Sequence, residues 1–450
     1  MRSIKAGFVG FGEVNTPKEK IEKLCADAAN ELRKIGWEVH SAGPVRDDED
    51  YIEADQAICT LKGQDFDLLV ICIAGWIPTH AVIRVTDQFR HIPMLLWGLT
   101  GWVEGERLIT TAPQAGTSAL RVVMEELGYR FRYVYNTIDS IPIQKISAFG
   151  QAARAANLLR GARIGSMGYR DMLLYGTSAD ILSLRREIGI EVECFEMLEM
   201  VRGLDDLDEK DVQETVDYCL QNWIFEKEPD PDILTRGARY YLALKKKVEK
   251  RRYDALTLVD VDGMKKLEGF PPAMVFMLLS DRLGLCTTPE NDIIGNVTQL
   301  MVRFLTGQSA PYMEYYEYFP DRVLIGVPDY VPAAVCKEGV RVVPAKFGHF
   351  YPSLLNISKV KDGPVTLLRL MESRGRYKLH MACGQAVQPR KWEEYGWEQP
   401  APQLPSLEVI LDEPVEDFVN QITSQHTIIA YGDITDEMTQ LCALLNISMI

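Results

Sequence analysis

The first third of the chain alternates between apolar runs and segments with helical spacing. Short apolar runs predict three buried strands, at 4–11, 67–73 and 92–97. Between the first two of these, apolar residues recur over 17–35 with the period of an amphipathic helix, which a glycine turn at Gly36 ends. Strands that alternate with helices are typical of a mostly parallel sheet covered by helices on both faces.

A second unit of the same kind begins near Gly161. The segment 162–168 repeats the pattern of an apolar strand followed by glycine that opens the chain at residue 4. A helix is predicted at 179–186, and further strands at 188–194 and 255–260. The pattern therefore predicts two doubly wound α/β domains in series.

The pattern changes again after residue 308, where apolar segments become short and rich in β-branched residues. Glycine or proline separates the predicted strands, which fall at 322–327, 340–343, 365–370, 377–381 and 407–411. This spacing indicates an antiparallel, barrel-like sheet. A proline-rich loop is expected at 398–405, and a closing helix at 435–445. The expected domains are 1–160, 161–307 and 308–450, two α/β domains followed by a C-terminal antiparallel β-rich domain.

Composition and charge exclude some classes of function. At 450 residues the chain is too long for one ordinary core. A formal net charge of −15 argues against a nucleic-acid partner, because phosphate binding needs clustered Lys and Arg. The basic run at 245–252 is interpreted as the solvated face of a helix. No apolar run reaches membrane-spanning length, and no signal peptide precedes the first strand, so we expect a cytoplasmic protein without a membrane partner.

A glycine-rich segment, Gly7-Phe8-Val9-Gly10-Phe11-Gly12, follows the first strand. Its order is G-x-x-G-x-G, whereas a dinucleotide site needs G-x-G-x-x-G for the pyrophosphate to reach the helix N-terminus. We therefore interpret it as a tight βα turn, and an NAD-dependent oxidoreductase is disfavoured. The nine cysteines form no C-x-x-C pair, which indicates neither a zinc ribbon nor a disulfide framework.

Three side chains in the last third of the chain suggest chemistry: Glu290, Glu314 and His426. Each also has a structural interpretation, since Glu290 opens a helical pattern, Glu314 lies in a tyrosine-rich strand and His426 precedes an apolar run. Taken together, two carboxylates and one imidazole suit a divalent cation of the manganese type with coordination positions left open. Their spacing alone leaves both interpretations open.

A family resemblance connects these three residues. The segments 288–298, 306–308 and 311–314 resemble the metal-site region of the superfamily of L-fucose and L-arabinose isomerases, and Gln425-His426 with Gly432-Asp433 resembles its C-terminal metal histidine. The resemblance implies that Glu290, Glu314 and His426 bind Mn²⁺ or another divalent cation. It further implies that Glu290 and Glu314 are the catalytic acid and base, that Trp76 and Gln425 contact the sugar, and that the protein is a homotrimer or homohexamer.

The activity that the resemblance implies is isomerisation of an open-chain aldose to a ketose through an enediol. The second acid is a glutamate, as in the arabinose branch, but the stretch 326–329 lacks the further metal histidine of that branch. The sugar is therefore open among pentoses, deoxyhexoses and a modified hexose such as sulfoquinovose. The alternative is a non-catalytic sugar-binding protein of two α/β lobes, which would give His426 no function.

Overall fold

The computed structural model describes residues 2–393, 395–396, 403 and 405–450, so the proline-rich loop predicted at 398–405 falls mainly outside the described residues. The chain forms two compact units. The first unit contains residues 1–157 and 436–445, and the second contains 158–435 and 446–450. The second unit holds both a parallel sheet and a barrel, and the domain boundary near residue 307 stays a prediction.

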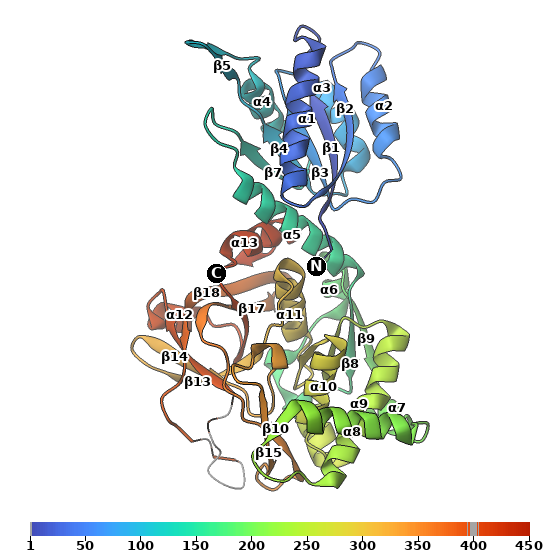
Figure 1. Cartoon of the computed structure of the whole chain (residues 1–450), viewed down its shortest axis with the longest axis vertical. Helices are drawn as coiled ribbons and strands as arrows, with labels where there is room; N and C mark the ends of the chain where they lie inside the picture. The colour runs from blue at the N-terminus through green and yellow to red at the C-terminus, as the bar shows by residue number, and fades with distance from the viewer. Residues whose placement is uncertain (1, 394, 397–402, 404) are drawn as a thin grey trace. The chain divides into compact units, whose positions relative to one another are not determined.

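The first unit is built on a five-stranded parallel sheet with the order β2-β1-β3-β4-β7 (Figure 1). Its strands are β1 (Lys5–Phe11), β2 (Glu38–Val45), β3 (Leu68–Ile73), β4 (Met94–Gly98) and β7 (Phe131–Tyr135). Its helices are α1 (Lys18–Lys34), α2 (Ile52–Leu61), α3 (Thr79–Thr86), α4 (Pro113–Glu126), most of α5 (Ile143–Gly161) and α13 (Thr435–Leu445). Every residue of β3 is buried, as expected for a central strand of a parallel sheet. A short hairpin, β5 (Trp102–Glu104) with β6 (Arg107–Ile109), adds to this unit.

Two glycines, Gly10 within β1 and Gly12 just after it, allow close packing of α1. A Cβ atom at Gly10 would lie 2.2 Å from Sγ of Cys25, and one at Gly12 would lie 2.7 Å from Cδ1 of Ile21. Both neighbours are buried residues of α1. The glycines therefore let the helix approach the strand, which is the role of a tight βα turn.

The second unit begins with a four-stranded parallel sheet, in the order β12-β11-β8-β9. Its strands are β8 (Arg163–Met167), β9 (Glu191–Phe195), β11 (Ala255–Leu258) and β12 (Cys286–Thr288). The helices around it are α6 (Ile181–Glu187), α7 (Met197–Arg202), α8 (Glu209–Asn222), α9 (Pro231–Arg251), α10 (Ala273–Leu283) and α11 (Ile293–Thr306). A π-helix, Asp260–Glu268, follows β11 directly.

The remainder of the second unit is a closed antiparallel barrel, drawn mainly in orange and red in Figure 1. Its strands pair in the order β17-β20-β13-β14-β19-β18, and pairing of β18 with β17 closes the ring. The strands are β13 (Tyr312–Tyr318), β14 (Arg322–Gly326), β17 (Gly363–Ser373), β18 (Arg376–Val387), β19 (Ser406–Leu411) and β20 (His426–Tyr431). The short helix α12 (Val415–Gln421) connects β19 to β20, and β21 (Ser448–Met449) pairs with β18. The predicted class, parallel α/β sheets followed by an antiparallel barrel, is confirmed.

One predicted strand has different partners from those expected. The strand at 340–343 forms as β15 (Val340–Lys346), but it pairs with β10 (Trp223–Phe225) and β16 (Pro352–Asn356) in a separate three-stranded sheet.

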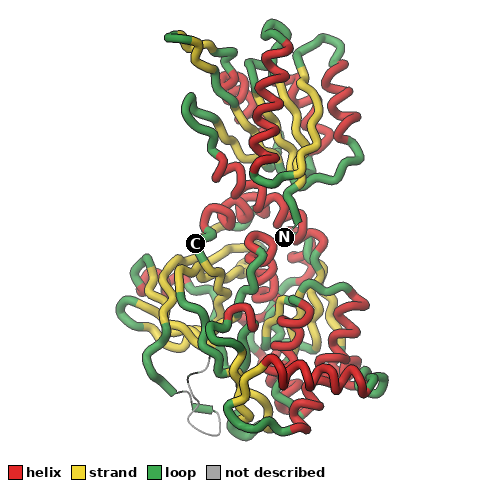
Figure 2. The backbone as a smooth tube through the Cα atoms, in the orientation of Figure 1, coloured by secondary structure: helices red, strands yellow, loops and turns green. Residues whose placement is uncertain are grey.

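Figure 2 shows the strands in yellow and the helices in red. Of the helices that the structure describes, none combines the length and apolar character needed to cross a membrane.

Candidate metal centre

Glu290 lies in a strained turn at the carboxyl end of β12. Glu290 and Asn291 have φ angles of 58° and 53°, in the left-handed region that residues other than glycine rarely adopt. The neighbouring strands hold the turn: the Asn291 backbone N–H donates to the carbonyl of Leu258 at 3.0 Å, and its side chain donates to the carbonyl of Tyr169 at 2.7 Å. The hydroxyl of Ser166 donates to Oδ1 of Asn291 at 2.7 Å. Strain of this kind persists only where the surrounding structure imposes it, and it concentrates at functional sites.

Glu314 and His426 come from neighbouring strands of the barrel. In the antiparallel pairing of β13 with β20, Glu314 stands directly opposite His426. Side chains of directly paired residues point to the same face of a sheet and lie close together. The register of the barrel therefore brings this carboxylate and this imidazole together.

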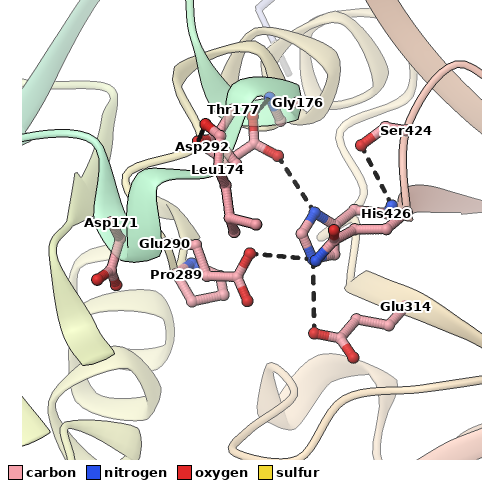
Figure 3. A network of polar contacts seen from close by, with 12 residues as sticks. Asp171, Leu174, Gly176, Thr177, Pro289, Glu290, Asp292, Glu314, Ser424 and His426 are labelled. Carbon is pink, nitrogen blue, oxygen red and sulfur yellow. Dashed lines mark hydrogen bonds and ion pairs between the residues drawn. The ribbon is translucent and has the colours of Figure 1, made fainter. Parts of the chain in front are cut away.

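The three predicted ligands meet at one point, as Figure 3 shows. Nε2 of His426 lies 3.2 Å from Oε2 of Glu290 and 3.5 Å from Oε1 of Glu314. One ligand atom from each residue lies within 4.8 Å of the others. His426 and Glu290 are buried, whereas Glu314 is partly exposed. The cluster is thus accessible to solvent on the side of Glu314.

Asp292 lies on the other side of the imidazole. Its Oδ2 is 3.7 Å from Nδ1 of His426. Arg369 of β17 binds both oxygens of Asp292, at 2.6 and 3.0 Å, and the Tyr312 hydroxyl donates to Oδ2 at 2.9 Å. Oδ1 also accepts the backbone N–H of Gly295 at 2.8 Å, which caps α11. A fully buried carboxylate with these partners is held rigidly in place.

The pKa values of the cluster follow from burial and from the close charges. Burial, together with the carboxylates of Asp260, Glu314 and Asp292, raises the pKa of Glu290 to about 8, although His426 opposes this rise. Burial lowers the pKa of His426, but the carboxylates around it outweigh burial and raise the value to about 9. For Asp292, burial is outweighed by Arg369 and His426, which hold its pKa well below the usual range. The raised pKa of Glu290 means that its ionised form is disfavoured among these acids, and a bound cation would offset that cost.

The residues fit a divalent cation. Within the described part of the chain, Oε2 of Glu290 is buried and accepts no hydrogen bond, although the imidazole faces it. Oxygen ligands from two carboxylates and one imidazole nitrogen form a donor set for manganese-type ions. Asp292 behind Nδ1 supplies the outer carboxylate that commonly orients a metal-bound histidine. Glu290, Glu314 and His426 would hold the ion, and their roles as ligands and as catalytic acid and base stay predictions.

The two predicted sugar-binding residues have different settings. The amide nitrogen of Gln425 lies 3.2 Å from Nε2 of His426, so this side chain reaches the cluster. Trp76 belongs to the first compact unit, where it follows β3 and is 40% exposed. Its backbone N–H donates to the carbonyl of Thr111 at 2.7 Å. Contact of either residue with a sugar stays a prediction.

Sequence reasoning did not identify Asp292, Arg369 and Tyr312 as partners of the site. Arg369 carried a usable signal, because an arginine inside the apolar run 365–370 must find a counter-charge when it is buried. Asp292 carried a weaker one, as the helix N-cap two residues after Glu290. Neither signal names the partner, which depends on closure of the barrel.

Comparison with known proteins agrees with this site. Residues 355–450 match the family model of the L-fucose isomerase C-terminal domain. Over 397 residues the chain is 21% identical to the sulfoquinovose isomerase of Priestia aryabhattai, with 86% of each chain covered. The sulfoquinovose isomerase of Priestia megaterium gives the same values.

The fold and these matches define a member of a sugar isomerase class. More specifically, the C-terminal family match and the similarity to two sulfoquinovose isomerases support the superfamily of L-fucose and L-arabinose isomerases, which the sequence predicted.

Proposed function

We propose that this protein is a metal-dependent aldose–ketose isomerase that acts on an open-chain sugar through an enediol. One observation carries the proposal: ligand atoms of Glu290, Glu314 and His426, which are far apart in the sequence, lie within 4.8 Å of one another. Membership of a sugar isomerase superfamily supports it. We propose Mn²⁺ as the cation, because it accepts both carboxylate oxygen and imidazole nitrogen.

The reaction moves one proton between carbons and another between oxygens. One carboxylate removes the proton from C2 of the aldose and returns a proton to C1, while a proton passes from the C2 hydroxyl to the C1 oxygen. When bound, a divalent cation supplies Lewis-acid stabilisation of the negative charge on the sugar oxygens. Glu290 and Glu314 both face Nε2 of the imidazole and are the two candidates for the proton transfers.

The substrate is proposed as a hexose or related aldose, with sulfoquinovose as the first sugar to test. The support is the similarity to two sulfoquinovose isomerases. We also propose a homo-oligomer, a trimer or a hexamer, which native mass spectrometry would measure directly.

The test is turnover of a panel of aldoses in D₂O by protein loaded with Mn²⁺. The panel contains sulfoquinovose, L-fucose, L-arabinose and unsubstituted hexoses, and the product is followed by NMR. We expect a ketose product that carries solvent deuterium at C1. Removal of the metal with a chelator should abolish this turnover. The Glu290→Gln variant should lose activity at least a hundredfold, because it removes both a ligand and a base. Glu317→Gln is the matched control, since Glu317 is exposed on the same strand as Glu314.

Two outcomes would contradict the proposal. If the Mn²⁺-loaded protein converted none of these sugars, the isomerase function would fail. If it bound a sugar tightly without converting it, the non-catalytic sugar-binding alternative would replace it.

A further inference from the structure

A buried lysine lies close to the metal centre without being one of its ligands. Lys265 is 5% exposed, and its Nζ lies 3.1 Å from Oδ2 of Asp260 and 2.9 Å from Oδ2 of Asp329. Both aspartates are also buried. Removing three charged groups from water is unfavourable unless their geometry is well satisfied, and such groups are often less stabilising than apolar replacements. A purely structural role therefore explains this cluster poorly.

Asp260 connects the cluster to the metal centre. Its Oδ2 faces Lys265, whereas its Oδ1 accepts the backbone N–H of Glu290 at 2.7 Å. Glu290 is the first of the two residues with left-handed backbone, so this hydrogen bond acts at the strained point of the turn. The two oxygens of one carboxylate thus serve two different donors.

The local backbone is unusual as well. Asp260 and Lys265 both lie in the π-helix Asp260–Glu268. π-Helical segments are rare and occur frequently at functional sites. Asp329 lies in the segment after β14 of the barrel, so Lys265 joins the π-helix to that segment. The lysine therefore holds Asp260 through the carboxylate oxygen that does not accept from Glu290.

We propose that Asp260 and Lys265 are positioning residues that hold Glu290 in the conformation needed to bind the cation. Asp260 holds the backbone of Glu290 directly, and Lys265 holds Asp260. The inference rests on the proposed metal centre. It assigns a function to two residues that contact neither the cation nor the sugar in the proposed reaction.

Two variants test the role through Mn²⁺ affinity, measured from the EPR signal of free Mn²⁺ without any sugar. In Asp260→Asn, the single amide oxygen can face only one of the two donors, Lys265 or the backbone N–H of Glu290. The amide NH₂, itself a donor, then faces the other. The oxygen will turn to the charged lysine, and Glu290 loses its acceptor. We expect affinity to fall at least tenfold, the range found for outer partners of metal ligands.

Lys265→Met separates positioning from simple electrostatics. Loss of a nearby positive charge would by itself strengthen cation binding. If Lys265 positions Asp260, the variant should instead bind Mn²⁺ at least tenfold more weakly. Asp281→Asn is the matched control, because Asp281 also accepts a backbone N–H, from Ala333 at 2.9 Å, but has no contact with the cluster among the described residues.

The results distinguish this inference from the proposed function. Wild-type-like Mn²⁺ affinity in Asp260→Asn, or tighter binding in Lys265→Met, would overturn the positioning role even in an active isomerase. Suppose that the folded wild-type protein binds Mn²⁺ but converts no sugar, and that both variants bind Mn²⁺ more weakly. This result would support the positioning role and reject the isomerase function. A wild-type protein that binds no Mn²⁺ would overturn this role together with the metal centre.

Discussion

Asp292 lies behind His426, with Oδ2 of the aspartate 3.7 Å from Nδ1 of the imidazole. The other ring nitrogen, Nε2, faces Glu290 and Glu314. A carboxylate at Nδ1 favours the proton on that nitrogen, so a bound cation would displace the proton on Nε2. Asp292 is itself clamped by Arg369, so the orientation of the ring depends on a connected set of buried residues.

Removing the charge of Asp292 should weaken cation binding. In Asp292→Asn the imidazole loses its outer carboxylate, and we expect Mn²⁺ affinity to fall tenfold to a hundredfold. A titration of the free Mn²⁺ EPR signal measures this. Asp321→Asn, in the exposed turn between β13 and β14, should leave the affinity unchanged. Equal affinity in the two variants would show that Asp292 does not orient the histidine.

Arg369 should be needed for stability as well as for the site. Arg369→Met leaves the buried Asp292 without its main counter-charge, and breaking a buried pair from one side costs about 3–5 kcal/mol. Urea denaturation measures the free energy of unfolding. Lys337→Met breaks the exposed pair with Asp362 and should cost less than about 1 kcal/mol. The double variant Arg369→Met/Asp292→Asn should lose less than the sum of its parts, and simple additivity would argue against coupling.

Gly295 should not tolerate alanine. A Cβ atom there would lie 2.9 Å from the Tyr312 ring and 3.0 Å from Oδ2 of Asp292. Both neighbours are buried, so we expect a loss of about 1–3 kcal/mol in stability and weaker Mn²⁺ binding through displacement of Asp292. Gly176→Ala is the control, since no atom lies within 4 Å of the added Cβ. Thermal unfolding and Mn²⁺ titration of both variants measure these effects. A Gly295→Ala protein with the stability and Mn²⁺ affinity of the wild type would contradict the prediction.

His380 should make the barrel acid-sensitive. It is 3% exposed, and burial lowers its pKa to about 4. In the unfolded chain its pKa is about 6.5. Between these values the unfolded state binds a proton that the folded state does not, so stability falls as the pH drops from about 6.5 to 4, by about 3 kcal/mol in total.

The His380→Gln variant isolates this contribution. Its free energy of unfolding should vary less with pH across that window than that of the wild type, because glutamine does not titrate there. Exposed His349→Gln should follow the wild-type curve. Parallel curves for wild type and His380→Gln would show that His380 does not cause the acid sensitivity.

Much of the fold could be read from local patterns. The buried run Leu68–Ile73, the helix that begins after Pro17 and the short strands after residue 308 each follow from periodicity over a few residues. Periodicity predicts an element because it depends only on which positions face the core. It does not predict partners, and the strand at 340–346 accordingly joined a separate sheet.

The sequence by itself determined the alternation of strands and helices, the change to a β-rich part and three candidate ligands. Only the tertiary structure decided that Glu314 and His426 pair across two strands, that Glu290 takes a left-handed backbone and that Arg369 and Lys265 find their aspartates. The physical reason is that periodicity is local. A metal site and its buried charges are satisfied by residues that meet only when the sheet and the barrel have closed.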